Sequence, residues 1–475
     1  MLATATPWLD TGDIQLRHEL QLLSDEGLIN TPLSTWPLST KDIYAHLTQP
    51  NEQNLIKPDL QKSYSYLSDR LKREDYGSSF KIGGNAYTKK LLIRDFSGAD
   101  REEAHIFYDG QWGNPILDIR LKASLANKSS HPSDKTFRLD ESYLASSFGN
   151  WKFTLGRQSR WWGPGWDGSL ILSNNARPIP SISLDRIESA PFKNKYLKWM
   201  GPWKLSIFAG RLESNRVISK AKLLGARLNF KPSPDFEIGL SRTAQWGGDG
   251  RPQTFSSLFN AIIGNDNFYS TDAGKKSEPG NQLAGIDFRW KSPLGINKPF
   301  AIYGQLIGED EAGYLPYKNI GLFGLETWHT SHAGSIRTYF EISDTSVDFF
   351  KGKERNNTAY NHSIYKSGYR YQGLSLGHSI DSDSRLLSAG IILSKKNGDF
   401  WRAWAKHATL NSDSKGKNPI AEKAKKWSSL GISLNRKLNT QTKLNLGLQL
   451  VTEKTIQNKR HNDAIISIGF SRSFN

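Results

Sequence analysis

One short stretch, RQSRWWGPGWDGSL at residues 157–170, combines residue types that suit contact with a sugar. An indole offers a flat apolar face for the C–H bonds of a sugar ring. An arginine fork meets a carboxylate, such as that of a uronate or pyruvate group, through two parallel hydrogen bonds. Candidates for glycan contact in and after this stretch are Arg157, Arg160, Trp161, Trp162, Trp166, Asp167 and Arg177. The alternative is that the tryptophans pack a folded-in loop, with the glycines and the proline shaping its turns.

A second stretch, QWGGDGRPQTF at residues 245–255, repeats this composition with Trp246, Asp249 and Arg251 around three glycines. Trp246 and Arg251 join the glycan-contact candidates, and Asp249 is a candidate for a loop ion pair. No phosphate-loop lysine follows the glycines, and the acidic spacing does not fit an EF-hand. We therefore favour a structural turn, because clustered glycines chiefly supply positive φ angles.

Three adjacent carboxylates, Glu309, Asp310 and Glu311, follow an alternating apolar segment. They are candidates for a calcium ligand or for an ion pair inside the fold. Catalysis by a carboxylate pair is disfavoured, because neighbours at the end of a strand point in alternate directions. No metalloprotease helix or serine-hydrolase elbow is present, and His362 and His378 are interpreted as ordinary surface histidines. We expect no catalytic residue, no metal and no cofactor, and therefore no enzyme.

The elements that must position these residues fall into two regions. Within residues 1–78 the pattern predicts a small helical bundle, with helices over 13–26, after the capping-box sequence STKD at 39–42, and over 60–71. From residue 79 to 475 the period changes to two, as in KLSIFAGRL, PDFEIGLSR and KLNLGLQLV. Roughly sixteen to eighteen such segments, separated by turn residues, predict antiparallel strands with one apolar face.

So many strands close either into a membrane barrel or into a soluble propeller. No repeat of blade length is visible, which disfavours the propeller. Aromatic residues recur near strand ends, and the final strand places Ile466, Ile468, Phe470 and Phe474 on one face. These features favour an all-β transmembrane fold, namely a closed outer-membrane barrel of about 18 strands.

Composition narrows the class of partner. Cysteine is absent, which removes disulfides and cysteine-based chemistry. The net charge is −4 over residues 1–80 and +21 over the remainder, which suggests an acidic partner for the second part. Nucleic acid is disfavoured because the cations are dispersed and form no single stripe. Basic residues near a barrel rim would instead neutralise membrane lipid and lipopolysaccharide, and attract an acidic polysaccharide.

Six stretches, in order along the chain, resemble the Wzi capsule-assembly family of Gram-negative outer-membrane proteins. They are RHELQLLSDEGLIN, LSTWPLS, WWGPGWDGSLILSNNARP, AQWGGDGRPQTFSSLFNAIIGNDN, EPGNQLAGIDF and YGQLIGEDEAGYLPY. The resemblance implies an eighteen-stranded barrel with a periplasmic helical bundle at its N-terminus. It also implies a lectin that holds capsular polysaccharide at the cell surface.

We therefore expect a monomeric outer-membrane barrel that binds capsular or other acidic surface polysaccharide noncovalently. Its helical N-terminus is expected in the periplasm, and a signal peptide is presumed to have been removed. The Trp/Gly/Arg loops are expected to line or close the lumen. The alternative is a porin or a glycan-specific channel, since a barrel of this size has an aqueous lumen unless loops fill it. A catalytic barrel and a soluble glycan-binding propeller are weaker alternatives.

Overall fold

The computed structural model describes residues 7–48, 57–73, 78–98, 101–127, 135–263, 280–293, 299–312, 315–349 and 356–474. Within these ranges, only the backbone is described for residues 72–73, 260–263, 310–312 and 315–317. No helix among the described residues is both long and apolar enough to cross a membrane.

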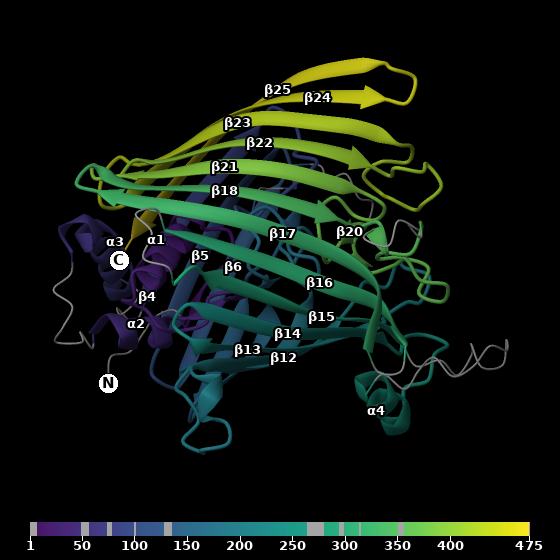
Figure 1. The fold of residues 1–475 in the computed structure, drawn as a ribbon, viewed down its shortest axis with the longest axis horizontal. Coiled ribbons are helices and arrows are strands. Elements are labelled where there is room, and N and C mark those ends of the chain that lie inside the picture. Colours follow the sequence, from purple (N-terminus) through teal and green to yellow (C-terminus); the bar gives the residue numbers. More distant parts are fainter. Residues whose placement is uncertain are drawn as a thin grey trace.

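A closed antiparallel β-barrel makes up most of the described chain (Figure 1). Its eighteen long strands are β4 (Ser78–Tyr87), β5 (Ala104–Gly113), β6 (Leu117–Ala126), β8 (Tyr143–Phe148), β9 (Trp151–Arg157), β11 (Pro180–Arg186), β12 (Trp203–Arg211), β13 (Lys222–Ser233), β14 (Phe236–Trp246), β15 (Gly280–Lys291), β16 (Phe300–Ala312), β17 (Leu315–Ser331), β18 (Gly334–Asp344), β21 (Arg385–Lys395), β22 (Phe400–Leu410), β23 (Lys425–Lys437), β24 (Thr442–Thr455) and β25 (Arg460–Phe474). The short β7 (Phe137–Arg138) pairs with β6 beside the direct β6–β8 ladder. β25 pairs with β4 from Ser467↔Tyr87 to Phe474↔Phe80, which closes the barrel.

Apolar and polar side chains alternate along the strands, and the apolar ones point outward while the polar ones point inward. On β24, Leu446, Leu448 and Leu450 are exposed on the outer face, while Gln449 is buried. The last strand behaves as the sequence predicts, because Ile466, Ile468, Phe470 and Phe474 are all exposed on one face. A barrel with an apolar outer wall and a polar interior is the arrangement that a lipid bilayer stabilises.

The predicted helices are present as α1 (Ile14–Asp25), α2 (Thr40–Thr48) and α3 (Gln61–Arg73), with a short 3₁₀ turn, η1 (Pro58–Leu60), before α3. They lie at one end of the barrel, where β25 ends (Figure 1). Asp13 caps α1 by accepting from the Leu16 amide at 2.9 Å, and Ser39 caps α2 through the Asp42 amide at 3.4 Å. The other half of the capping box is absent, because the Asp42 carboxylate accepts from Thr31 and Ser189 and pairs with Lys204.

The helices share a hydrophobic cluster with the barrel. Leu16, Leu20 and Leu67 pack in one group with Trp161 of a barrel loop and Trp328 of β17. The short pairs β1 (Trp8–Leu9) with β3 (Leu38–Ser39), and β2 (Thr35–Trp36) with β10 (Trp161–Trp162), add backbone links. The division of the chain into two domains near residue 78 stays a prediction.

The two ends of the barrel differ in their connections. At the end that carries the helices, most turns are short, such as those between β17 and β18 and between β23 and β24. At the other end several connections are long, and two of them carry α4 (Phe255–Ile263) and the hairpin of β19 (Arg370–Tyr371) and β20 (Leu374–Ser375), although those between β16 and β17 and between β24 and β25 are short. Short turns on one side and long loops on the other are typical of outer-membrane barrels, whose short turns face the periplasm.

Candidate functional site

The tryptophan-rich loop after β9 folds into the barrel and is buried there. Trp161, Trp162 and Trp166 are only 1%, 0% and 1% exposed. Trp161 pairs with Trp36 in the β10–β2 ladder, and the Trp162 ring stands edge-on to Phe208 with centroids 5.6 Å apart. The rings therefore have protein on all sides, and the loop acts as a plug in the lumen.

Wall residues hold this plug through hydrogen bonds and ion pairs. Glu341 of β18 accepts from the Trp166 amide at 2.8 Å, and Glu326 of β17 accepts from the Trp166 indole at 2.9 Å. Asp167 lies 2.8 Å from the Arg402 guanidinium and 3.0 Å from the Lys406 ammonium, both on β22. Charge-assisted bonds of this kind fix a loop strongly when water is excluded.

Helix α1 supports the plug from the other side. Arg17 donates to the carbonyls of Pro164 at 2.6 Å and Gly165 at 2.8 Å. Burial lowers the pKa of Arg17 to about 10, so the side chain stays charged at neutral pH. The helical segment and the loop are thus locked to each other inside the barrel.

The predicted arginines do not gather on one surface. Arg177 donates to Asp140 at 2.8 Å, and Arg157 approaches the same carboxylate at 4.0 Å. Arg160 instead lies over the Phe208 ring at 4.3 Å. Their role in glycan contact stays a prediction, as does that of the three buried tryptophans.

The second glycine-rich stretch forms a turn, as its composition predicts. Gly247, Gly248 and Gly250 have φ angles of 62°, 101° and 77°. The Lys222 ammonium lies 5.1 Å from the Trp246 ring centroid. Asp249 and Lys220 form a surface pair at 3.7 Å. The Arg251 amide donates to the Gly248 carbonyl at 3.1 Å within the turn, and glycan contact by Trp246 or Arg251 stays a prediction.

In the acidic stretch, the buried Glu309 accepts from the Tyr360 amide at 2.7 Å and so anchors a long loop. The side chains of Asp310 and Glu311 lie outside the described residues. The interpretation of His378 as a surface residue is wrong, because the ring is 0% exposed and packs against Gly168 of the plug. Its Nδ1 accepts from the Ile380 amide at 3.2 Å, and burial lowers its pKa to about 3.

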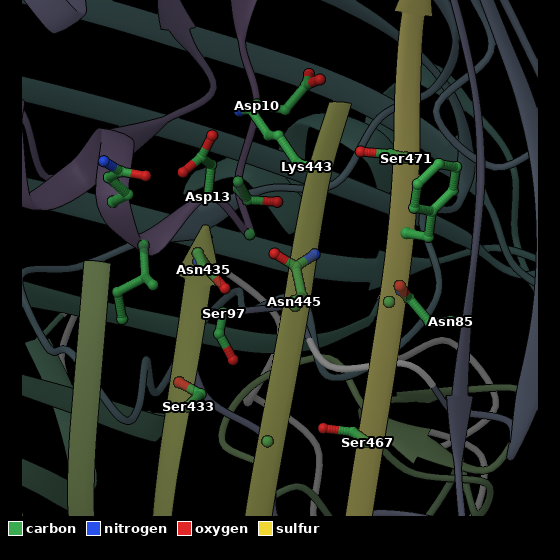
Figure 2. A pocket seen from close by; sticks show the side chains of 18 of the residues that line it. Asp10, Asp13, Asn85, Ser97, Ser433, Asn435, Lys443, Asn445, Ser467 and Ser471 are labelled. Atoms are coloured by element: carbon green, nitrogen blue, oxygen red, sulfur yellow. The ribbon is translucent and has the colours of Figure 1, made fainter. Parts of the chain in front are cut away.

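Beside the plug, the barrel holds a polar cavity of about 570 Å³ that reasoning from the sequence missed. Its wall includes Ser433 and Asn435 of β23, Asn445 of β24, and Ser467 and Ser471 of β25 (Figure 2). Asp10 and Asp13 approach it from the N-terminal segment, and Ser97 from the loop before β5. Hydroxyl and amide side chains in this density can exchange hydrogen bonds with a polyhydroxylated ligand.

Cations outnumber carboxylates around this cavity. Arg70 pairs with Asp13 at 3.1 Å, and Arg120 pairs with Asp109 at 2.8 Å. Lys81, Lys122 and Lys443 also line the cavity, and none of the three forms an ion pair with a described residue. Burial raises the pKa of the Asp13 carboxyl, but the charges of Arg70 and Lys443 outweigh burial and hold that pKa below its usual value.

Aromatic faces complete the cavity. Tyr66, Phe107 and Trp404 line it, and the ammonium groups of Lys81 and Lys122 lie 5.6 and 5.4 Å from the Phe107 ring centroid. Hydroxyls, amides, unpaired lysines and ring faces together can bind a sugar that carries a carboxylate. Among the described residues, no group of three acidic or histidine side chains is placed to hold a metal ion.

These features define a class of protein: a plugged membrane β-barrel with a polar, cationic cavity in its lumen. The family model of capsule assembly protein Wzi matches residues 57–464. The chain therefore belongs to the Wzi capsule-assembly family, and it is an outer-membrane β-barrel.

Two relatives illustrate the match. An uncharacterised 55.8 kDa protein of the cps region of Klebsiella pneumoniae is 32% identical over 411 residues, which cover 85% of this chain and 77% of the relative. The solved structure of Wzi from Escherichia coli aligns with a TM-score of 0.86 and 28% identity, over 99% of this chain and 100% of that one. That protein is described as an outer-membrane protein involved in group 1 capsule assembly and as a carbohydrate-binding β-barrel.

Proposed function

We propose that this protein holds an acidic capsular polysaccharide noncovalently at the bacterial surface, as a lectin and not as an enzyme. In this proposal the long loops face outward, and the helices close the periplasmic end of a monomeric barrel. No cofactor and no reaction takes part. Membership of the Wzi family and the carbohydrate binding attributed to the E. coli relative support it.

The observation that carries the proposal is the set of unpaired lysines in the lumen cavity. Lys81 and Lys443 line a wall of Ser and Asn side chains, and neither has an ion-pair partner among the described residues. A half-buried ammonium facing a cavity attracts an anion more strongly than a surface lysine does, because less water screens it. A chain end or a short acidic segment of polysaccharide is the ligand that we assign to this cavity.

The test immobilises the detergent-folded protein and measures retention of purified acidic capsular polysaccharide against neutral dextran, at low and at high salt. We expect selective retention of the acidic polymer that survives high salt. Loss of all retention at high salt would reduce the interaction to general attraction by a basic surface. Retention of neither polymer would contradict the proposal and favour the channel alternative.

Matched variants then test the cavity itself. Lys443→Gln and Lys81→Gln are each expected to weaken retention about tenfold, because each removes one charge-assisted hydrogen bond. Lys454→Gln is the control, since Lys454 is an exposed residue near the far end of the same strand, β24, and the change in net charge is equal. Equal weakening by Lys443→Gln and Lys454→Gln would show that the cavity is not the binding site.

A further inference from the structure

The connection between β11 and β12, residues 187–202, is unusual for its end of the barrel. The turns between β17 and β18, and between β23 and β24, are far shorter. This connection carries the sequence PFKNKYLKWMGPW at 191–203 and contains the short 3₁₀ turn η2 (Lys198–Met200). Between Ser189 and Trp203 it has three lysines and no acidic residue.

The connection folds over the outer wall of the barrel. Phe230 of β13 points outward, because its neighbours Asn229 and Lys231 hydrogen-bond to Ser34 and Ser24 in the interior. The Trp199 ring stands edge-on over Phe230, with centroids 5.7 Å apart. Trp199 therefore lies on the lipid-facing side of the wall.

An ordered aromatic stack fixes this position. Phe192 stacks on Trp203 with centroids 4.3 Å apart, and the Arg186 guanidinium covers the Trp203 ring at 3.7 Å. Gly201 has a φ of 65°, and a Cβ there would collide with the Lys231 carbonyl, so the turn needs glycine. The connection is thus held against the wall by its own packing.

The outer surface of this connection is exposed. Tyr196, Leu197 and Trp199 are 71%, 40% and 60% exposed. They continue the apolar outer face of the adjacent strands, where Ile182 and Ile207 are also exposed. Lys193, Lys195 and Lys198 are exposed between them, and none forms an ion pair with a described residue.

We propose that the exposed surface formed by Lys193, Lys195, Tyr196, Leu197, Lys198 and Trp199 is a membrane anchor that binds the anionic phospholipid headgroups of the leaflet at the short-turn end. Tyrosine and tryptophan favour the boundary between acyl chains and headgroups, and lysines reach from there to lipid phosphates. Continuity with the lipid-facing wall and the charge of the three lysines select this partner over another protein. The anchor would fix the depth of the barrel in its membrane.

The chain has no cysteine, so single labels can be placed in the full-length protein. Tyr196→Cys and, as a control, His332→Cys carry a nitroxide, and the protein is reconstituted into liposomes with or without anionic phospholipid. His332 lies in the short turn at the same end, and its side chain is 85% exposed. Collision with oxygen and with a water-soluble nickel chelate reports the depth of each label, and symmetric leaflets make the direction of insertion irrelevant.

In anionic liposomes we expect the label at position 196 to collide mainly with oxygen, which concentrates in the membrane. The label at position 332 should collide mainly with the nickel chelate, which stays in water. A variant of the Tyr196→Cys protein then has Gln in place of Lys193, Lys195 and Lys198. The ratio of the membrane-inserted to the water-exposed form of the connection should fall about fivefold for each lysine replaced. A label at 196 that is as accessible to the chelate as the one at 332 would overturn the proposal. So would the same depth at 196 with and without anionic lipid.

Discussion

The guanidinium of Arg17 lies 4.3 Å from the centroid of the Trp166 ring, and this contact joins helix α1 to the loop that fills the barrel. The same guanidinium faces Phe96 at 4.4 Å and donates to two backbone carbonyls of the loop. One buried cation thus ties α1, the plug and the segment around Phe96 together. Because the helix and the loop depend on each other for these contacts, we expect them to leave the lumen together.

Arg17→Met tests this dependence. The change removes two charge-assisted hydrogen bonds, each of about 1.5–3 kcal/mol, and leaves buried carbonyls without donors. In planar bilayers we expect no large conductance steps from the wild type and fluctuating steps from the variant.

Lys57→Met is the control for that measurement, because it breaks a surface ion pair with Glu26 in the same N-terminal region. The control should behave like the wild type. Large, steady steps from the wild type would contradict the plug and support the porin alternative.

Trp161→Ala separates packing from ligand contact. Because the indole is buried against Trp36 and Phe96, truncation should destabilise the fold by about 3–5 kcal/mol. The midpoint of thermal unfolding in detergent should fall, while the fraction that remains folded retains acidic polysaccharide as the wild type does. A folded variant that no longer retains polysaccharide would instead make Trp161 a contact residue.

His378→Asn tests a pH dependence that is built into the loops. The folded pKa of His378, about 3, lies below its value of about 6.5 in the unfolded chain, so the unfolded chain binds the extra proton. The stability that comes from the neutral ring is therefore complete above pH 6.5 and falls by about 1.4 kcal/mol per pH unit as the pH drops toward 3. Asparagine keeps an acceptor for the Ile380 amide but cannot be protonated.

The readout is the difference in unfolding free energy between variant and wild type at pH 7 and at pH 5. The pKa of His18 and His46 is also lowered by burial, and the pKa of Asp383 is raised to about 6, but these groups titrate in both proteins. We expect the variant to lose less stability than the wild type on acidification. Equal losses would contradict a buried neutral His378.

Gly168→Ala tests how tightly the plug meets its neighbours. A Cβ at this position would overlap the His378 ring, and overpacking of this kind costs about 1–3 kcal/mol. Gly250→Ala is the comparison, because it has a positive φ of 77° but no atom within 4 Å of the added carbon. Urea unfolding should place Gly168→Ala below Gly250→Ala in stability, and the reverse order would contradict the packing.

The sequence alone determined the class of fold. A period of two is a local property of the chain. Segments such as 204–212 and 443–451 therefore predict strands, and the structure confirms them as β12 and β24. The helices over 13–26 and 60–71 could be predicted in the same way, because helix caps and apolar stripes also depend only on residues close together in the sequence. The resemblance to the Wzi family was also visible in the sequence, in six short stretches.

Only the tertiary structure decided where the chemistry lies. The tryptophans of the 157–170 stretch could face a sugar or the protein, and burial against α1 and the walls of β17 and β18 placed them inside. In the sequence, the Ser and Asn side chains at 433, 435, 445, 467 and 471 look like ordinary inward-facing positions. Their recurrence on three successive strands could nevertheless have indicated a polar cavity wall. Whether Lys81 or Lys443 finds a carboxylate depends on residues far away in sequence. The period of two is a property of the sequence of each strand by itself. Charge pairing instead depends on which strands face each other across the lumen.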